Sequence, residues 1–133
     1  MYHAYVQMEK VNEGDAKNVL MAALTRTPYL KTVFAFDPDV DIFDEDDVLW
    51  ALSTRVVPDQ DLLIIPGARG NRLDPTTYTI TRLARDGMVT KMGIDATIPM
   101  GLPYDYPDRL EIPGVEEIRI EDYVSPSKVG VGQ

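Results

Sequence analysis

The stretch TVFAFDPDVDIFDEDDVLWALSTRV, residues 32–56, decides the fold. Its first five residues form a short apolar run that is typical of a buried β-strand. Asp44 follows at a place where helix N-caps are preferred, and the acidic residues Glu45–Asp47 suit the positive end of a helix dipole. The apolar positions after them recur at helical spacing: Val48, Ala51, Leu52 and Val56. This stretch therefore predicts a strand that leads into an amphipathic helix.

Similar patterns lie on both sides of it. Apolar and polar residues alternate over His3–Glu9, as in a half-buried strand. Asp15 is the predicted N-cap of a second amphipathic helix, which should end before Pro28 because the residue before a proline avoids helical geometry. A third buried strand is predicted at Leu62–Ile65 and should stop at Pro66.

The resulting order is β-α-β-α-β. Strands that alternate with amphipathic helices favour an α/β fold, here a layered, mainly parallel or mixed β-sheet flanked by helices. A chain of 133 residues is long enough for one such domain, which we expect over residues 1–124. Residues 125–133 contain Gly, Ser and Pro, and are expected to form a disordered tail.

Patterns in the second half are weaker. Gly67–Pro75 is predicted to be a loop, and Thr76–Thr81 is either a strand or irregular. Further strands are expected at Met92–Ile98 and at Glu116–Ile120. Between them, Pro99–Pro113 contains four prolines and should be an extended surface segment.

Composition excludes several classes of function. The net charge of −9 argues against a nucleic-acid partner, because phosphate backbones attract basic surfaces. Without cysteine the chain has neither disulfides nor thiolate metal sites. No apolar run approaches the roughly 18 residues that span a bilayer, and no signal-peptide pattern opens the chain, so we expect a cytoplasmic protein without a membrane partner. His3 is the only histidine, so it is expected to be structural.

Alternating acids at Asp37, Asp39 and Asp41 look like the start of a calcium loop. An EF-hand also needs Gly at its sixth position and Glu at its twelfth, where this chain has Ile42 and Val48. The EF-hand hypothesis therefore fails. The acidic run could still attract a divalent ion, but a strand-to-helix turn with a cap explains it more simply, and we predict no metal ligand.

Residues 69–91 form a basic segment in an acidic chain, with five basic and two acidic residues. This segment could hold a small anion; alternatively, its arginines pair with the acidic majority. Gly67–Arg72 looks like a phosphate loop, but it matches neither the Walker sequence nor the dinucleotide fingerprint. Lys91 ends the segment and precedes Gly93, where a lysine could contact a phosphate as a point charge.

Three segments together resemble the C-terminal domain of the UbiD family. The first is YVQMEK at residues 5–10 with GDAK at residues 14–17. The second is KTVFAFDPDVDIFD at residues 31–44, which runs on into DVLWALSTRV at residues 47–56. The third is TKMGIDAT at residues 90–97. The resemblance covers roughly residues 3–100. Its middle segment is specific, because no general physical requirement makes that pattern recur. The part after residue 100 is less similar to the family.

The resemblance implies a reversible decarboxylase of aromatic, heteroaromatic or α,β-unsaturated acids that uses prenylated FMN, a divalent metal and potassium. In the family, the flavin lies between a central split-barrel domain and the C-terminal α/β domain, which also mediates dimerisation. Lys91 matches the lysine that contacts the cofactor phosphate. Asp95 and Thr97 would lie near the substrate side of the pocket.

The family's catalytic Glu-Arg-Glu set and its metal ligands belong to the flavin domain, which this chain lacks. The reaction needs an acid for proton delivery and an arginine for the carboxylate, so we predict no catalytic residue and no activity from this chain alone. The leading hypothesis is the small subunit of a split UbiD-like (de)carboxylase, with a large subunit that supplies the flavin barrel. It is motivated by a domain that starts at Met1.

Two alternatives remain open at this stage. One is a non-catalytic assembly or binding module, which would form homo-oligomers through the family's dimerisation surface and bind no flavin. The other is a piece of a longer enzyme. The substrate and the direction of the reaction depend on a pocket formed mostly by the missing domain.

Overall fold

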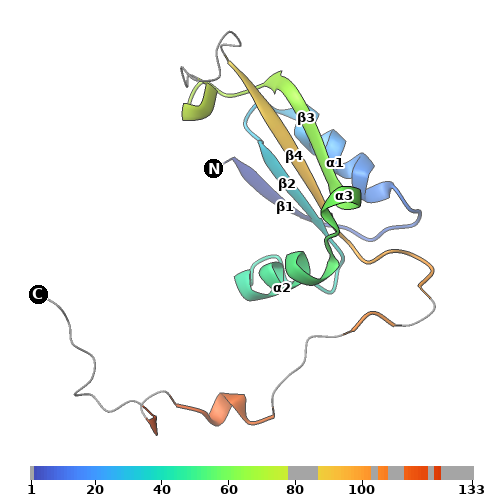
Figure 1. Cartoon of the computed structure of the whole chain (residues 1–133), viewed down its shortest axis with the longest axis vertical. Helices are drawn as coiled ribbons and strands as arrows, with labels where there is room; N and C mark the ends of the chain where they lie inside the picture. The colour runs from blue at the N-terminus through green and yellow to red at the C-terminus, as the bar shows by residue number, and fades with distance from the viewer. Residues whose placement is uncertain (1, 78–86, 103–104, 108–112, 120–121, 124–133) are drawn as a thin grey trace, which may run out of the picture.

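The computed structural model describes residues 2–77, 87–102, 105–107, 113–119 and 122–123. Figure 1 shows one sheet with helices on both of its faces. The elements in chain order are β1 (His3–Gln7), α1 (Asp15–Arg26), β2 (Thr32–Phe36), α2 (Glu45–Arg55), α3 (Pro58–Asp61), β3 (Leu62–Arg69), the 3-10 turn η1 (Pro75–Thr77), β4 (Met88–Ala96) and the 3-10 turn η3 (Val115–Glu117).

The sheet has four strands in the order β1-β2-β4-β3. The β1–β2 and β2–β4 pairs are parallel, whereas β3 runs antiparallel to β4. The predicted α/β fold with a mixed sheet is therefore confirmed. Because β1, β2 and β4 point the same way, the residues that follow them meet at one end of the sheet, called here the carboxyl edge.

Helix α1 covers one face of the sheet. Its Leu20 and Leu24 are fully buried against Val33 and Ala35 of β2. Gly93 of β4 allows this close contact, since a Cβ placed there would lie 3.1 Å from the Leu20 Cβ. Packing of this kind needs no polar partners and gives α1 a fixed position across the middle of the sheet.

Helix α2 covers part of the opposite face. Val48 and Ala51 are buried against Phe36 and Ala96, which lie at the carboxyl ends of β2 and β4. The ring of Tyr5 meets the ring of Phe34 edge-on at 5.3 Å between centroids, beside this cluster. In Figure 1, α1 lies behind the sheet and α2 lies beneath the carboxyl edge.

The two predicted helix caps had different outcomes. Asp44 caps α2 as expected, because its Oδ1 accepts the backbone N–H of Asp46 at 3.0 Å. The prediction for Asp15 was wrong, since Gly14 with φ 90° is the N-cap and Asp15 is the first helical residue. Its carboxylate instead accepts the backbone N–H groups of the preceding turn, at 3.0 and 2.8 Å from Val11 and Asn12.

Strand boundaries differ most in the second half. β3 continues to Arg69 instead of ending at Ile65, because a register shift between Ile65 and Ala68 accommodates the proline within the strand. The predicted loop therefore starts later than Gly67. β3 is also an edge strand with Ile64 52 % exposed, so the expectation of a buried strand was wrong. β4 covers Met88–Ala96 and thus begins before the predicted Met92.

The edge strand expected at Glu116–Ile120 does not form. Val115–Glu117 is a 3-10 turn behind Gly114, whose φ of 79° starts a tight turn in place of an extended strand, and Ile120 lies outside the described residues. For Thr76–Thr81, η1 accounts for the first two residues, and residues 78–86 are outside the description. The tail expected at 125–133 also lies outside it.

Candidate functional site

The carboxyl edge is where an α/β sheet most often binds ligands, because loops from neighbouring parallel strands converge there. Here it gathers the loop after β1, the loop after β2 and the segment after β4. Ionisable or polar side chains come from each of these: Lys10, Asp37, Asp39 and Thr97. The last turn of α2 adds Arg55, whose side chain is only 2 % exposed.

Arg55 joins the loop after β2 to helix α2. Its two terminal nitrogens form a bidentate pair with Asp39, at 3.1 Å from Oδ1 and 2.5 Å from Oδ2. Its Nη1 also lies 3.4 Å from Oδ2 of Asp37. A bidentate guanidinium–carboxylate pair fixes orientation as well as distance, so it holds the loop in one geometry.

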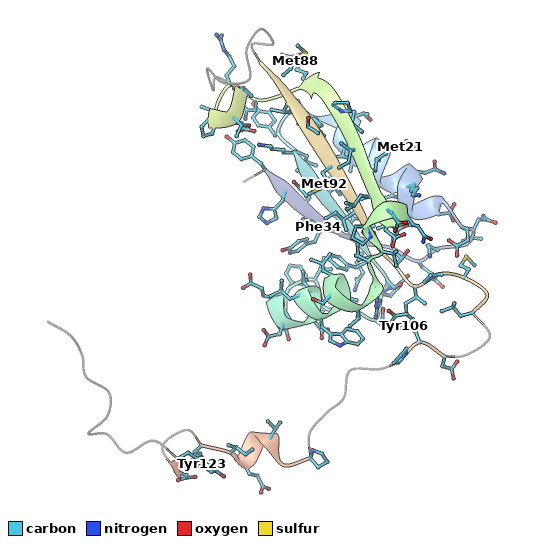
Figure 2. All side chains as sticks on the ribbon, viewed as in Figure 1. Met21, Phe34, Met88, Met92, Tyr106 and Tyr123 are labelled. Carbon is cyan, nitrogen blue, oxygen red and sulfur yellow. The ribbon has the colours of Figure 1, made fainter. Side chains whose placement is uncertain are left out.

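Two aromatic rings enclose the same guanidinium. The Cζ of Arg55 lies 5.4 Å from the ring centre of Trp50 and 5.6 Å from that of Tyr106. Tyr106, labelled in Figure 2, also donates its hydroxyl to the carbonyl oxygen of Thr54. Among the described residues, Nε of Arg55 is buried without a hydrogen-bond partner. The rings therefore supply part of the stabilisation that water would otherwise give to the cation.

The two carboxyl groups on Arg55 titrate in opposite directions. Burial raises the pKa of Asp37, and this outweighs the backbone N–H of Ile98 and the charges of Lys10 and Arg55. The hydrogen bond from Arg55 lowers the pKa of Asp39, which is more exposed to solvent. Asp37 is thus the more enclosed group, and it accepts the N–H of Ile98 at 2.6 Å.

Asp95 and Thr97, predicted to lie beside the substrate, are together at the carboxyl edge. Oδ1 of Asp95 accepts the backbone N–H of Thr97 at 3.0 Å and its hydroxyl at 2.6 Å. Glu13, in the loop after β1, accepts the backbone N–H of Met100 and lies 3.6 Å from Nζ of Lys10. The segment after β4 is therefore held by both neighbouring loops.

Lys91 lies elsewhere. Its Nζ donates to the carbonyl oxygens of Leu24 at 2.5 Å and Thr27 at 2.7 Å, and the residue is 4 % exposed. Burial lowers its pKa. These are carbonyls at the C-terminal end of α1, where helix hydrogen bonding leaves oxygens unpaired and a cation is favourable.

Lys91 and Asp95 project from the same face of β4, four residues and about 13 Å apart along the strand. Leu20 of α1 contacts Gly93 between them. The structure thus brings Asp95 and Thr97 together and leaves Lys91 apart from them, under the far end of α1.

The basic segment lines a pocket near that far end. Arg69, Arg72 and the glycines of the β3–β4 hairpin surround a cavity of about 690 Å³, together with Tyr29. The predicted loop Gly67–Arg72 therefore belongs partly to β3 and partly to this pocket. Arg82 and Arg85, the other arginines of the segment, are outside the described residues.

The acidic run after β2 forms the strand-to-helix connection that was predicted. Asp41 Oδ1 accepts the backbone N–H of Phe43 at 2.9 Å, and Asp47 Oδ2 accepts that of Asp41 at 3.1 Å. Over the described ranges, no three His, Cys, Asp or Glu side chains are arranged to hold a metal ion. The ring of His3 lies 5.6 Å from that of Tyr5.

Residues 1–96 match the family model described as the 3-octaprenyl-4-hydroxybenzoate carboxy-lyase C-terminal domain, UbiD_C. The chain belongs to the UbiD family. It is 48 % identical over 98 residues to an anhydromevalonate phosphate decarboxylase of Methanothermobacter thermautotrophicus, which covers 74 % of this chain and 22 % of that relative.

Two solved UbiD-class enzymes have the same fold. HmfF from Pelotomaculum thermopropionicum, in complex with FMN, is 44 % identical with a TM-score of 0.72, over 92 % of this chain and 26 % of that one. An evolved dimeric form of HmfF contains prFMN. Vanillic acid decarboxylase ShVdcCD from Sedimentibacter hydroxybenzoicus is 36 % identical with a TM-score of 0.65, over 85 % and 24 % of the two chains.

The chain spans about a quarter of each of these UbiD relatives. Where the structure describes it, no helix has the length and apolar character to cross a membrane. The sequence analysis did not predict the cluster that Arg55 forms with Asp37 and Asp39 at the carboxyl edge. Asp37 and Asp39 were visible as an acidic run, but nothing local indicates that an arginine 16 residues later pairs with them.

Proposed function

We propose that this chain is the small subunit of a split UbiD-like (de)carboxylase, a cytoplasmic enzyme acting on aromatic or unsaturated carboxylic acids. One observation carries the proposal: ShVdcCD, a relative with more than one component that has also been solved with a truncated ShVdcD, is 36 % identical over 85 % of this chain. In the proposed assembly, a UbiD-like large subunit supplies the flavin-carrying part of the enzyme.

The carboxyl edge is the part of this chain that we assign to the active site. Asp95 and Thr97 would form part of the substrate wall, held in place by Asp37 and Glu13 through the backbone of the segment after β4. Arg55 is not available to bind a substrate carboxylate, because Asp37 and Asp39 already engage it and two rings cover it. The arginine and the acid of the reaction would therefore come from the large subunit.

The cofactor would be prenylated FMN, shared between the two subunits. The carboxyl edge does not form a phosphate site on its own, because it presents several carboxylates. Lys91 has three N–H donors, of which Leu24 and Thr27 take two. We assign its third donor to a phosphate oxygen that approaches the end of α1 when the large subunit is bound.

The test is affinity purification of the tagged chain from its native host, with mass spectrometry and an absorption spectrum of the eluate. The proposal expects a UbiD-like large subunit with a flavin spectrum. Lys91→Ala should lower the flavin content of that assembly, whereas Lys17→Ala, which changes an exposed lysine on α1, should not. Failure to recover a large subunit, together with unchanged flavin content in Lys91→Ala, would refute the proposal.

One observation favours a second candidate, a non-catalytic assembly module that binds no flavin. The contacts of Lys91 with Leu24 and Thr27 give this lysine a structural task that needs no cofactor. Light scattering with and without FMN separates the two candidates. A stable homo-oligomer whose mass and melting temperature are indifferent to FMN would favour the assembly module.

A further inference from the structure

Among the described residues, no helix lies over half of one face of the sheet. Across the strands, His3, Thr32, Met92 and Ile64 are aligned in register, and Phe34 lies in the next row. We call these five residues, with Met88 and Thr90 of β4, the open face. Figure 1 shows α1 behind the sheet and α2 only beneath the carboxyl edge, and Figure 2 labels Phe34, Met92 and Met88 along the uncovered part.

Four of the seven open-face residues are apolar: Phe34, Ile64, Met88 and Met92. Of these, Phe34 also borders the cluster under α2. Ile64 is 52 % exposed and Met88 is 37 % exposed, although both lie within strands. None of the seven residues is Asp, Glu, Lys or Arg, in a chain where charged residues make up 26 %. Parallel strands are normally covered on both faces, since their connections place helices there. A surface with this composition in this position is expected to be buried in the assembled protein.

Helix α2 lies at the carboxyl end of this surface, where Val48 and Ala51 pack on Phe36 and Ala96. Leu49 is 54 % exposed, although it belongs to a helix whose sheet side is buried. The uncovered length of β4, from Met88 to Met92, is about 13 Å, close to the diameter of one helix.

We propose that the open face is the docking surface for an apolar face of a helix in the flavin-carrying large subunit. The inference rests on the proposed function and deepens it by naming the surface that joins the subunits. A helix laid beside α2 would complete the second helical layer and cover Ile64 and Met92 together. Its contacting side chains would be mainly aliphatic or aromatic. Arg69, which is in register with Met88, adds one positive charge at the margin of the surface.

The length of the relatives favours the large subunit as the occupant over a second copy of this chain. The match covers only 22 % of the anhydromevalonate phosphate decarboxylase and 26 % of HmfF, so most of each relative is left to supply a covering helix.

The experiment uses the full chain, tagged and expressed in its native host. Ile64→Lys places a charge on the edge-strand side of the open face, and Thr90→Arg adds bulk and charge to an exposed position on β4. Met21→Lys is the matched control, because Met21 is 41 % exposed on α1, on the opposite side of the sheet. Melting temperatures establish that all variants are folded.

We expect wild type and Met21→Lys to recover equal amounts of a UbiD-like flavoprotein, and both open-face variants to recover at least tenfold less. Equal recovery by all four proteins would overturn the docking surface and leave the split enzyme standing. Recovery by none, including wild type, would overturn the split enzyme and this inference with it. If instead wild type is a dimer that Ile64→Lys converts to a monomer, the occupant is a second copy and the inference is wrong.

Discussion

The two ends of β4 use buried charge in different ways. At the carboxyl edge, Arg55 pairs with carboxylates of another loop, and that loop in turn holds the backbone of Ile98. At the other end, Lys91 has no described carboxylate partner and donates to helix carbonyls. Similar buried cations can therefore either join separate loops or complete one helix. Only the first arrangement places several chain segments at a common site.

The largest effect is expected at Arg55. Arg55→Met removes the charge that compensates Asp37 and opens the contact between α2 and the loop after β2. Breaking a buried ion pair by removing one partner typically costs a few kcal/mol, and we expect about 3 kcal/mol of unfolding free energy in urea denaturation. Arg26→Met, an exposed arginine at the end of α1, should cost less than about 0.5 kcal/mol. Similar losses for the two variants would refute the joining role of Arg55.

Lys91→Met should have a smaller effect of about 2 kcal/mol, because it leaves two carbonyl oxygens without their donor but also removes a buried charge. The loss should be local. Hydrogen exchange should speed up in the last turn of α1 and stay unchanged at the carboxyl edge. Lys17→Met serves as the control. Faster exchange at Ile98 in Lys91→Met would show that the two ends of β4 are coupled, and this would contradict separate roles for Lys91 and Arg55.

Thr97→Val tests the segment after β4. It removes the hydroxyl that donates to Asp95 at 2.6 Å while keeping the backbone N–H and the size of the side chain. We expect a loss of about 1 kcal/mol, measured by urea denaturation. Thr25→Val is the control, because the Thr25 hydroxyl donates to the carbonyl oxygen of Met21 in the same helix at an exposed position. This variant should lose less unfolding free energy. An equal loss would mean that the Asp95–Thr97 turn is not a specific support of the edge.

The smallest effects concern pH. Because the pKa of Asp39 is lowered, its contribution to stability is present above its unfolded pKa and lost as pH falls through the folded one. Because the pKa of Asp37 is raised, its contribution is present below its unfolded pKa and lost as pH rises through the folded one. Asp39→Asn should therefore destabilise more at pH 7 than at pH 3, and Asp37→Asn should show the opposite trend. Parallel pH profiles for the two variants would contradict this assignment.

Local patterns predicted much of the first half. The strand at Thr32–Phe36 has the bounds expected, the second helix begins at Glu45 as expected, and Asp44 caps it through the backbone of Asp46. Such predictions succeed because the partners lie within a few residues of each other. The placement of Asp95 beside Thr97 could be expected from their spacing for the same reason. The direction and exposure of β3 could not, since Leu62–Ile65 has the same composition in either orientation.

The sequence by itself determined the α/β class, the strand–helix units of the first half and membership of the UbiD family, because these depend on short-range periodicity and on specific local motifs. Only the tertiary structure decided that Lys91 meets the end of α1, more than sixty residues away, and that Arg55 joins the loop after β2. It also decided which half of the sheet face the described helices leave uncovered. Each of these depends on how separate elements pack, and packing brings together residues whose spacing along the chain carries no signal.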